Sequence, residues 1–185
     1  MRVFFTTTPR LKINHDQNIE EIFRALEDLG HEFTNDYLRK IDVEGFYQFD
    51  EKKVPVYYEE ILDGLKKADV VIFESSLHSI GVGHLLQLAL DRGQGVIALH
   101  MPGKFPFFLG GIKTEKLIIE EYTPENVKKV LKLAFEQIKD QMDERFTLLL
   151  PPKIVSYLND LSKKKNIPKS VFIRGLIERE MGEKK

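Results

Sequence analysis

The chain has 185 residues, of which 42% are hydrophobic and 31% charged, with a formal net charge of −1. This balance excludes a disordered or fibrous chain, and the length suits one well-buried domain with a small appendage. The absence of cysteine excludes disulfides, thiolate metal ligands and a cysteine nucleophile. The chain opens on the apolar stretch MRVFF without a basic leader, and no apolar run has the length of a membrane span. We therefore expect a cytoplasmic protein without membrane contact.

The charge is divided unevenly along the chain. Residues 145–185 contain ten Lys and Arg against four Asp and Glu, a net charge of +6, while the rest of the chain carries −7. Opposed charges in two parts of a chain indicate a separate basic module at the C-terminus.

The first 140 residues alternate strand-like and helix-like stretches, which is typical of a parallel sheet flanked by helices. Gly30 stands where a helix-ending glycine is expected, and GFYQFDEKK has the composition of a surface loop. Strands are predicted at residues 2–6, 31–34, 69–74, 95–100 and 116–122. Helices are predicted at residues 19–29, 56–67, 81–92 and 124–140.

The last forty or so residues follow a different pattern, with one short strand, RFTLLLPP, and two helices, Lys153–Lys165 and Lys169–Met181. Phe146, Leu148 and Leu150 share one face of the strand, and both helices carry apolar stripes. One strand cannot satisfy its backbone or close a core alone. The segment therefore predicts a homodimer or a higher homo-oligomer.

The C-terminal pattern, RFTLLLPPKIVSYLNDLSKKKNIPKSVFIRGLIEREM, resembles the ribbon-helix-helix family, whose paired strands enter the major groove of DNA. The resemblance gives a domain over residues 145–182, with Arg145, Thr147 and Leu149 toward the bases. Lys169, and Ser170 as the N-cap of the second helix, would bind a phosphate. Leu149 departs from the family's polar residue and weakens base readout. The alternative is a ribbon that serves only as a dimerisation clamp.

Residues 68–100, ADVVIFESSLHSIGVGHLLQLALDRGQGVIALH, resemble the nucleoside 2-deoxyribosyltransferase family and its relatives that hydrolyse deoxynucleoside monophosphates. The resemblance implies a domain over residues 1–140 with a flavodoxin-like, five-stranded parallel sheet and a nucleotide site at the carboxyl ends of its strands. The loop TTTPRL and the Gly-x-Gly turn provide the expected nucleotide-binding residues, which are Thr7, Thr8, Arg10, Ser79, Gly81 and Gly83.

The family's catalytic positions are apolar in this chain. Its catalytic glutamate falls at Leu85 and its helper carboxylate at Ile61, and neither side chain can attack or stabilise an anomeric carbon. Glu74 is a candidate for a relocated nucleophile, although a carboxylate at a strand end more often caps the next turn. His78 and His84 lie near the same turn without the HxxxH or HxH spacing of a metal site. We expect no metal, no cofactor and no catalysis.

An aromatic loop follows the predicted strand at residues 95–100. It is interpreted as a lid over a base or, preferably, as a surface that packs against a neighbouring subunit. Its notable residues are His100, Lys104, Phe105, Phe107 and Phe108.

The sequence thus predicts a dimeric DNA-binding protein, a transcriptional regulator or an antitoxin-like protein, whose catalytically degenerate nucleotide-binding domain acts as a ligand sensor. The expected partners are a second copy of the chain, duplex DNA and a nucleotide ligand. Two alternatives stay open. One is an N-glycosidase or deoxyribosyltransferase with relocated catalysis, and the other is an oligomeric scaffold with neither activity.

Overall fold

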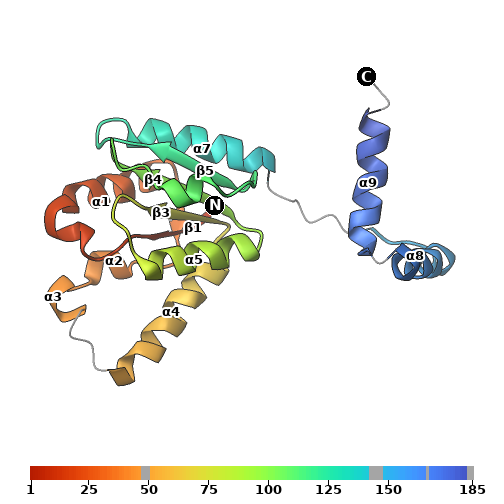
Figure 1. Ribbon diagram of the computed structural model, residues 1–185, viewed down its shortest axis with the longest axis horizontal. Helices are drawn as coiled ribbons and strands as arrows, with labels where there is room; N and C mark the ends of the chain where they lie inside the picture. The colour runs from red at the N-terminus through yellow and green to blue at the C-terminus, as the bar shows by residue number, and fades with distance from the viewer. Residues whose placement is uncertain (47–50, 142–147, 166, 183–185) are drawn as a thin grey trace. The chain divides into compact units, whose positions relative to one another are not determined.

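The structure is a computed structural model that describes residues 1–46, 51–141, 148–165 and 167–182 (Figure 1). The chain divides into two compact units, Met1–Asp143 and Glu144–Lys185. None of the helices in the described part of the chain is long and apolar enough to cross a membrane.

The first unit is a parallel sheet with the strand order β2-β1-β3-β4-β5. This is the flavodoxin-like order, so the predicted α/β fold class is confirmed. The strands are β1 (Arg2–Thr6), β2 (Glu32–Phe33), β3 (Val70–Glu74), β4 (Gly95–His100) and β5 (Leu117–Glu121). The helices are α1 (Leu11–Asp28), α2 (Tyr37–Lys40), α3 (Val43–Phe46), η1 (Glu51–Lys53), α4 (Val54–Lys67), α5 (Ile80–Asp91), α6 (Phe107–Gly110) and α7 (Val127–Gln141).

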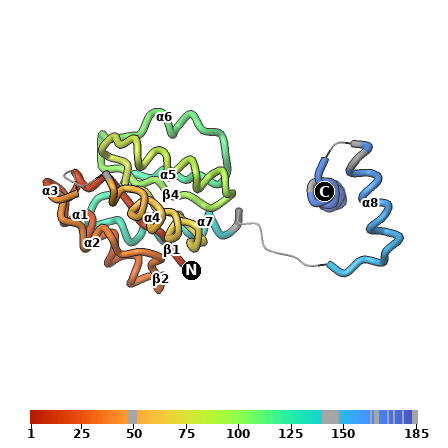
Figure 2. Tube along the Cα trace, turned by 90° about the horizontal axis from the view of Figure 1, so that it is seen from below, coloured from red at the N-terminus to blue at the C-terminus, as the bar shows by residue number. Residues whose placement is uncertain are grey.

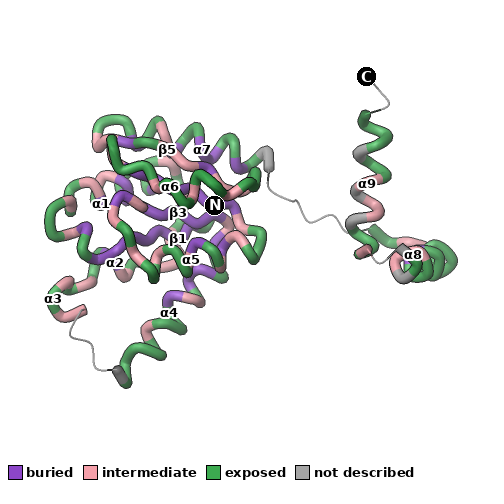
Figure 3. The backbone as a smooth tube through the Cα atoms, viewed as in Figure 1, coloured by how far each residue is buried: buried purple, intermediate pink, exposed green. Residues whose placement is uncertain are grey.

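The central strands are apolar on both faces because helices cover both sides of the sheet. In β3, Val70 and Ile72 belong to the hydrophobic core that includes α1 and α7. Val71 and Phe73 point the other way, into the core that includes α4 and α5. β3 is buried along its whole length and β1 at every residue after Arg2, and Figure 3 shows the buried central strands. This two-sided burial explains why DVVIFE reads as an unbroken apolar run.

Several helix boundaries differ from the predictions. Helix α1 begins at Leu11, well before residue 19, and a kink at His15 (φ −138°) separates its first turn from the rest. Gly30 follows its end with a φ of 76°, as a helix-ending glycine should. The short helices α2 and α3 were not predicted. They lie side by side at one edge of the first unit in both views (Figures 1 and 2).

The second unit contains α8 (Pro152–Lys165) and α9 (Lys169–Gly182). Arg145 and Thr147 lie outside the described residues, and Leu148–Leu150 form no strand in the single chain, because a β-ladder needs a second strand. Ser170 was predicted as the N-cap, which is wrong. Helix α9 already includes Lys169, and the Pro168 carbonyl accepts the first helical bond from the Phe172 N–H at 3.2 Å.

Two glycines test the backbone account of the first unit. Gly30→Ala should destabilise it by about 1 kcal/mol because alanine disfavours a positive φ. Gly83→Ala should stabilise it by about 0.5 kcal/mol because a helical glycine is replaced. An added Cβ meets no atom within 4 Å at either position, so packing does not interfere. Urea unfolding of both variants checks the prediction, and equal signs would contradict it.

Candidate functional site

The candidate site lies where β1 and β3 end side by side. Helix α1, which follows β1, packs on one face of the sheet, and α5, which follows β3, packs on the other. The two chain segments therefore diverge and leave a crevice at the carboxyl ends of the strands, where open α/β sheets bind ligands. A cavity of about 740 Å³ occupies this position. Its lining residues are Thr6, Thr7, Thr8, Pro9, Arg10, Tyr37, Phe46, Tyr57, Tyr58, Ile61, His78, Ser79, Ile80, Gly81, Val82, His84 and Leu85.

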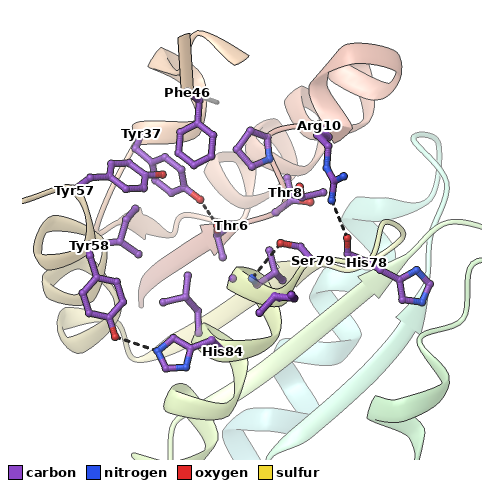
Figure 4. Close-up of a pocket in the computed structure, with 17 residues that line it drawn as sticks. Thr6, Thr8, Arg10, Tyr37, Phe46, Tyr57, Tyr58, His78, Ser79 and His84 are labelled. Atoms are coloured by element: carbon purple, nitrogen blue, oxygen red, sulfur yellow. Dashed lines mark hydrogen bonds between the residues drawn. The ribbon is translucent and has the colours of Figure 1, made fainter. Parts of the chain in front are cut away.

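One side of the cavity is polar and lies between two helix N-termini. Helix α1 starts directly after Arg10, and α5 starts directly after Ser79. The Arg10 guanidinium donates a hydrogen bond from Nη2 to the His78 carbonyl at 3.2 Å, which joins the two loops (Figure 4). Thr8 is buried on this side, and its side chain makes no hydrogen bond within the part of the chain that the structure describes.

Helix α5 directs backbone N–H groups toward this polar side. The Ser79 hydroxyl accepts from the Val82 N–H at 3.4 Å, and the Ser79 carbonyl accepts from the Gly83 N–H at 3.0 Å. Ile80 and Gly81 come before these two donors in α5. Their N–H groups are the first of the helix, and such groups have no partner inside it. Both residues line the cavity, so their N–H groups and the helix dipole favour an anion there.

The opposite side of the cavity is aromatic (Figure 4). Tyr57 makes edge contacts with Tyr37 and Phe46, at ring-centroid distances of 5.8 and 5.4 Å. The Tyr37 hydroxyl is hydrogen-bonded to Thr6 Oγ1. Burial raises the pKa of Tyr37 to about 12, although its hydrogen bonds with Thr6 and Tyr57 oppose the rise. Tyr58 completes this side through a bond between its hydroxyl and His84 Nε2 at 3.0 Å.

Most residues that the resemblance implied are found at the cavity. Its lining includes Thr7, Thr8, Arg10, Ser79 and Gly81, whereas Gly83, further along α5, is not among the lining residues.

The two family catalytic positions also meet at this cavity. Ile61 on α4 and Leu85 on α5 both line it, and so do the two nearby histidines. No aspartate or glutamate is among the lining residues that the structure describes. Nor do the described residues contain a group of three or more His, Asp or Glu side chains that could hold a metal ion.

Glu74 is completely buried and is not among the residues that line the cavity. Its carboxylate accepts hydrogen bonds from the Ser76 hydroxyl, from Thr7 Oγ1 at 3.2 Å and from the Tyr122 hydroxyl at 3.4 Å. It also accepts the Ser76 N–H at 3.3 Å, which is the turn-capping role expected of a strand-end carboxylate. Burial raises the pKa of Glu74, and these hydrogen bonds oppose the rise.

The aromatic loop after β4 does not cover this cavity. Phe105, Phe107 and Phe108 are not among the lining residues, and Phe107 and Phe108 are 83% and 96% exposed on the short helix α6. His100 is buried, with its Nδ1 3.0 Å from the Met101 carbonyl. The lid interpretation therefore does not describe this structure.

Sequence reasoning missed the aromatic side of the cavity. Tyr37 and Phe46 lie on the two unpredicted helices, and Phe46 belongs to the stretch interpreted as a surface loop. Tyr57 and Tyr58 lie on a predicted helix, and their spacing from Ile61 was a usable signal, because residues three and four positions apart share a helix face.

Comparisons with known proteins connect the chain to one fold. No family model matches it, and no curated protein matches it. Among solved structures it is similar to the CMP N-glycosidase BcmB of Clostridium botulinum, with 20% sequence identity and a TM-score of 0.52. The similarity covers 72% of this chain and 99% of that chain. At this level of identity the likeness shows the fold alone.

The buried Glu74 carboxyl predicts a pH-dependent stability. Because its pKa is raised in the folded state, its contribution to the free energy of unfolding is fully present at low pH. That contribution is lost as the pH rises through the raised pKa. Relative to Glu74→Gln, the wild type should therefore lose stability as the pH rises from below the ordinary pKa of a glutamate through the raised pKa of Glu74, at no more than about 1.4 kcal/mol per pH unit.

Urea unfolding of both proteins across this pH range measures the difference. The matched control is Glu121→Gln, because Glu121 is an exposed carboxylate on β5. A difference that does not change with pH, or a wild type that gains stability relative to Glu74→Gln as the pH rises, would contradict the account.

Proposed function

We propose that the first unit binds a nucleoside 5′-monophosphate without cleaving its glycosidic bond, and that the second unit pairs with another copy and binds duplex DNA. The protein then acts as a ligand-responsive regulator, either of transcription or in the manner of an antitoxin. The observation that carries the first half is the apolar pair Ile61 and Leu85 in a cavity whose described lining contains no carboxylate.

The shape and chemistry of the cavity support a nucleotide. A volume of about 740 Å³ lies within the range of small-molecule sites. The polar side offers Arg10, the Thr8 hydroxyl and the N-terminus of α5 to a phosphate. The aromatic side offers ring faces to a base. We assign Thr7, Thr8, Arg10, Ser79 and Gly81 to the nucleotide, with Gly83 supporting the turn.

The absence of catalysis follows from what glycosidic cleavage requires. Glycosidases generally use a pair of carboxyl groups, one to assist the leaving group and one to stabilise or attack the anomeric carbon. Leucine and isoleucine do neither. Glu74 cannot replace them in this structure because its carboxylate is buried and already bonded to Ser76, Thr7 and Tyr122.

An N-glycosidase or deoxyribosyltransferase is the second candidate function. It is favoured by the similarity in fold to a CMP N-glycosidase. It requires a catalytic group from outside the described lining, or a rearrangement that brings Glu74 into the cavity. An oligomeric scaffold is the third candidate, and it predicts no ligand in the cavity.

The second unit supports association with a second copy. Leu158 is its only buried apolar side chain among those described, and the helices in Figure 3 are largely exposed. A single chain thus leaves a large apolar surface in water, which a partner would cover. The exposed apolar residues are Leu148, Leu149, Ile154, Val155, Tyr157, Leu176, Ile177 and Met181.

The DNA-binding proposal rests on charge and position. The segment's net charge of +6 matches a polyanionic partner. Lys169 and Ser170 are exposed in the first turn of α9, and Leu149 is 93% exposed. Lys169 also donates a hydrogen bond to Asn159 Oδ1 at 2.8 Å, which fixes its position beside α8. With Arg145 and Thr147, these residues are the proposed DNA contacts.

The first test separates binding from turnover. Calorimetry with the full-length protein and CMP should show saturable binding, and chromatography of the same mixture should show no free cytosine. Arg10→Ala should weaken binding about tenfold or more through loss of a charge-assisted phosphate contact. Arg24→Ala is the matched control, because Arg24 is an exposed arginine of α1 that pairs with Glu21 and does not line the cavity.

Release of cytosine that Glu74→Gln abolishes would support the second candidate and identify the relocated nucleophile. Absence of binding to any nucleoside monophosphate would refute the proposal for the first unit, and the scaffold would remain only if the second unit also binds no DNA.

The second test concerns the C-terminal unit. Leu176→Asp, on the exposed apolar surface of α9, should convert a dimer into a monomer and abolish binding to duplex DNA at low salt. Glu180→Gln is the matched control on the same helix, because Glu180 is exposed and its loss should preserve both properties. Light scattering after gel filtration and a mobility-shift assay measure the two outcomes.

A wild type that is monomeric at micromolar concentration would refute the association. A dimer that binds no duplex at low salt would reduce the second unit to a clamp between copies.

A further inference from the structure

The hydroxyl groups on the aromatic side of the cavity already have partners inside the protein. The Tyr37 hydroxyl is bonded to Thr6 Oγ1, and the Tyr58 hydroxyl is bonded to His84 Nε2 at 3.0 Å. Tyr57 is engaged as well, since its hydroxyl is hydrogen-bonded to Tyr37. A base that used these hydroxyls for recognition would have to compete with bonds that the protein makes to itself.

The side chains that usually read the edge of a base are missing from the lining residues that the structure describes. Asn and Gln read adenine, carboxylates read the amino group of cytosine, and Arg or Lys reads guanine. No Asn, Gln, Asp, Glu or Lys is among the described lining residues, and the one arginine, Arg10, lies on the polar side. Figure 4 shows Arg10 and Ser79 across the cavity from Tyr57.

Aromatic rings recognise a base by its face. Every base has a π-face, so stacking tolerates any base, whereas hydrogen bonds to the edge distinguish one base from another. Here the rings of Tyr57, Tyr37 and Phe46 contact one another edge to face, which holds them in fixed relative positions. Within the described lining, the aromatic side therefore provides a preformed ring surface without an amide, carboxylate or lysine side chain to read the edge of a base.

We infer that the cavity selects for an aromatic ring joined to a phosphate but does not select which nucleobase the ring is. The inference rests on the proposed function and deepens it, because it sets the ligand class as nucleoside monophosphates of all bases. The ring lies on the aromatic side, the phosphate at Arg10 and the N-terminus of α5, and the sugar passes Ile61 and Leu85.

Calorimetry of the full-length protein with CMP, UMP, AMP, GMP and ribose 5-phosphate tests the inference. The four nucleotides should bind within about fivefold of one another, and ribose 5-phosphate, which lacks the ring, should bind about tenfold more weakly or worse. Tyr57→Leu should weaken all four nucleotides by a similar factor, about fivefold or more, and leave ribose 5-phosphate unchanged. Tyr57→Phe, which keeps the ring, should bind all of them within about twofold of the wild type.

The outcomes are distinguishable. One base that binds more than about twentyfold tighter than the others would refute the inference while leaving the proposed function intact. A large loss of affinity in Tyr57→Phe would likewise refute it, because a hydroxyl would then be reading the base. Equal binding of ribose 5-phosphate would show that the ring surface is not used.

Failure of every nucleotide to bind would overturn the proposed function and this inference together. Thermal unfolding verifies that both variants are folded. If Tyr57→Leu does not fold, Tyr57→Phe, which keeps the ring, still tests the inference.

Discussion

The candidate site depends on the pairing of β1 with β3, which places the ends of two strands side by side, with Thr6 opposite Phe73. After that pair the chain leaves in two directions, because α1 packs on one face of the sheet and α5 on the other. The crevice between them is therefore a consequence of topology, and it brings two helix N-termini to one place. Thr7 Oγ1 fixes the junction by donating to the Glu74 carbonyl across the strand pair at 2.8 Å.

Glu74 is an acidic residue at the edge of the site, and its hydrogen bonds connect parts of the fold to one another. Its carboxylate connects the ends of β1 and β3 to Tyr122, which follows β5, and Ser76 extends the network to the N–H of Met101 beyond β4. All of these donors are neutral, so burial raises the carboxyl pKa. The network orients the loops that line the cavity, and a ligand in the cavity would meet Thr7 and not the carboxylate.

Ile61 and Leu85, at the two positions where the resemblance places carboxylates, are apolar, and this affects the chemistry of the cavity. A carboxylate beside the rings of Tyr37 and Tyr57 would carry a desolvation cost and would repel a phosphate. Ile61 and Leu85 cause neither effect and contribute apolar surface to the lining of the cavity. The apolar character of both residues is therefore consistent with the proposal that the cavity retains an intact nucleotide.

The sequence predicts the sheet well because each central strand is buried on both faces, which leaves an unmistakable apolar run such as DVVIFE or GVIALH. It does not predict the aromatic side, since Tyr37 and Phe46 lie on four-residue helices whose position depends on contacts distant in sequence. Ser170 was predicted to lie just before α9, but it lies in the first turn of that helix. Serine is common at both positions, so the sequence alone does not distinguish them. The pairing of the second unit stays a prediction.

A ligand-bound structure would decide whether the cavity holds a nucleotide with an intact glycosidic bond, as we propose. A crystal structure of the full-length protein soaked with CMP should show continuous electron density from phosphate to base. Its phosphate should lie beside Arg10 and its ring against Tyr57. Separate densities for cytosine and ribose 5-phosphate, or a nucleotide bound anywhere other than this cavity, would contradict the account.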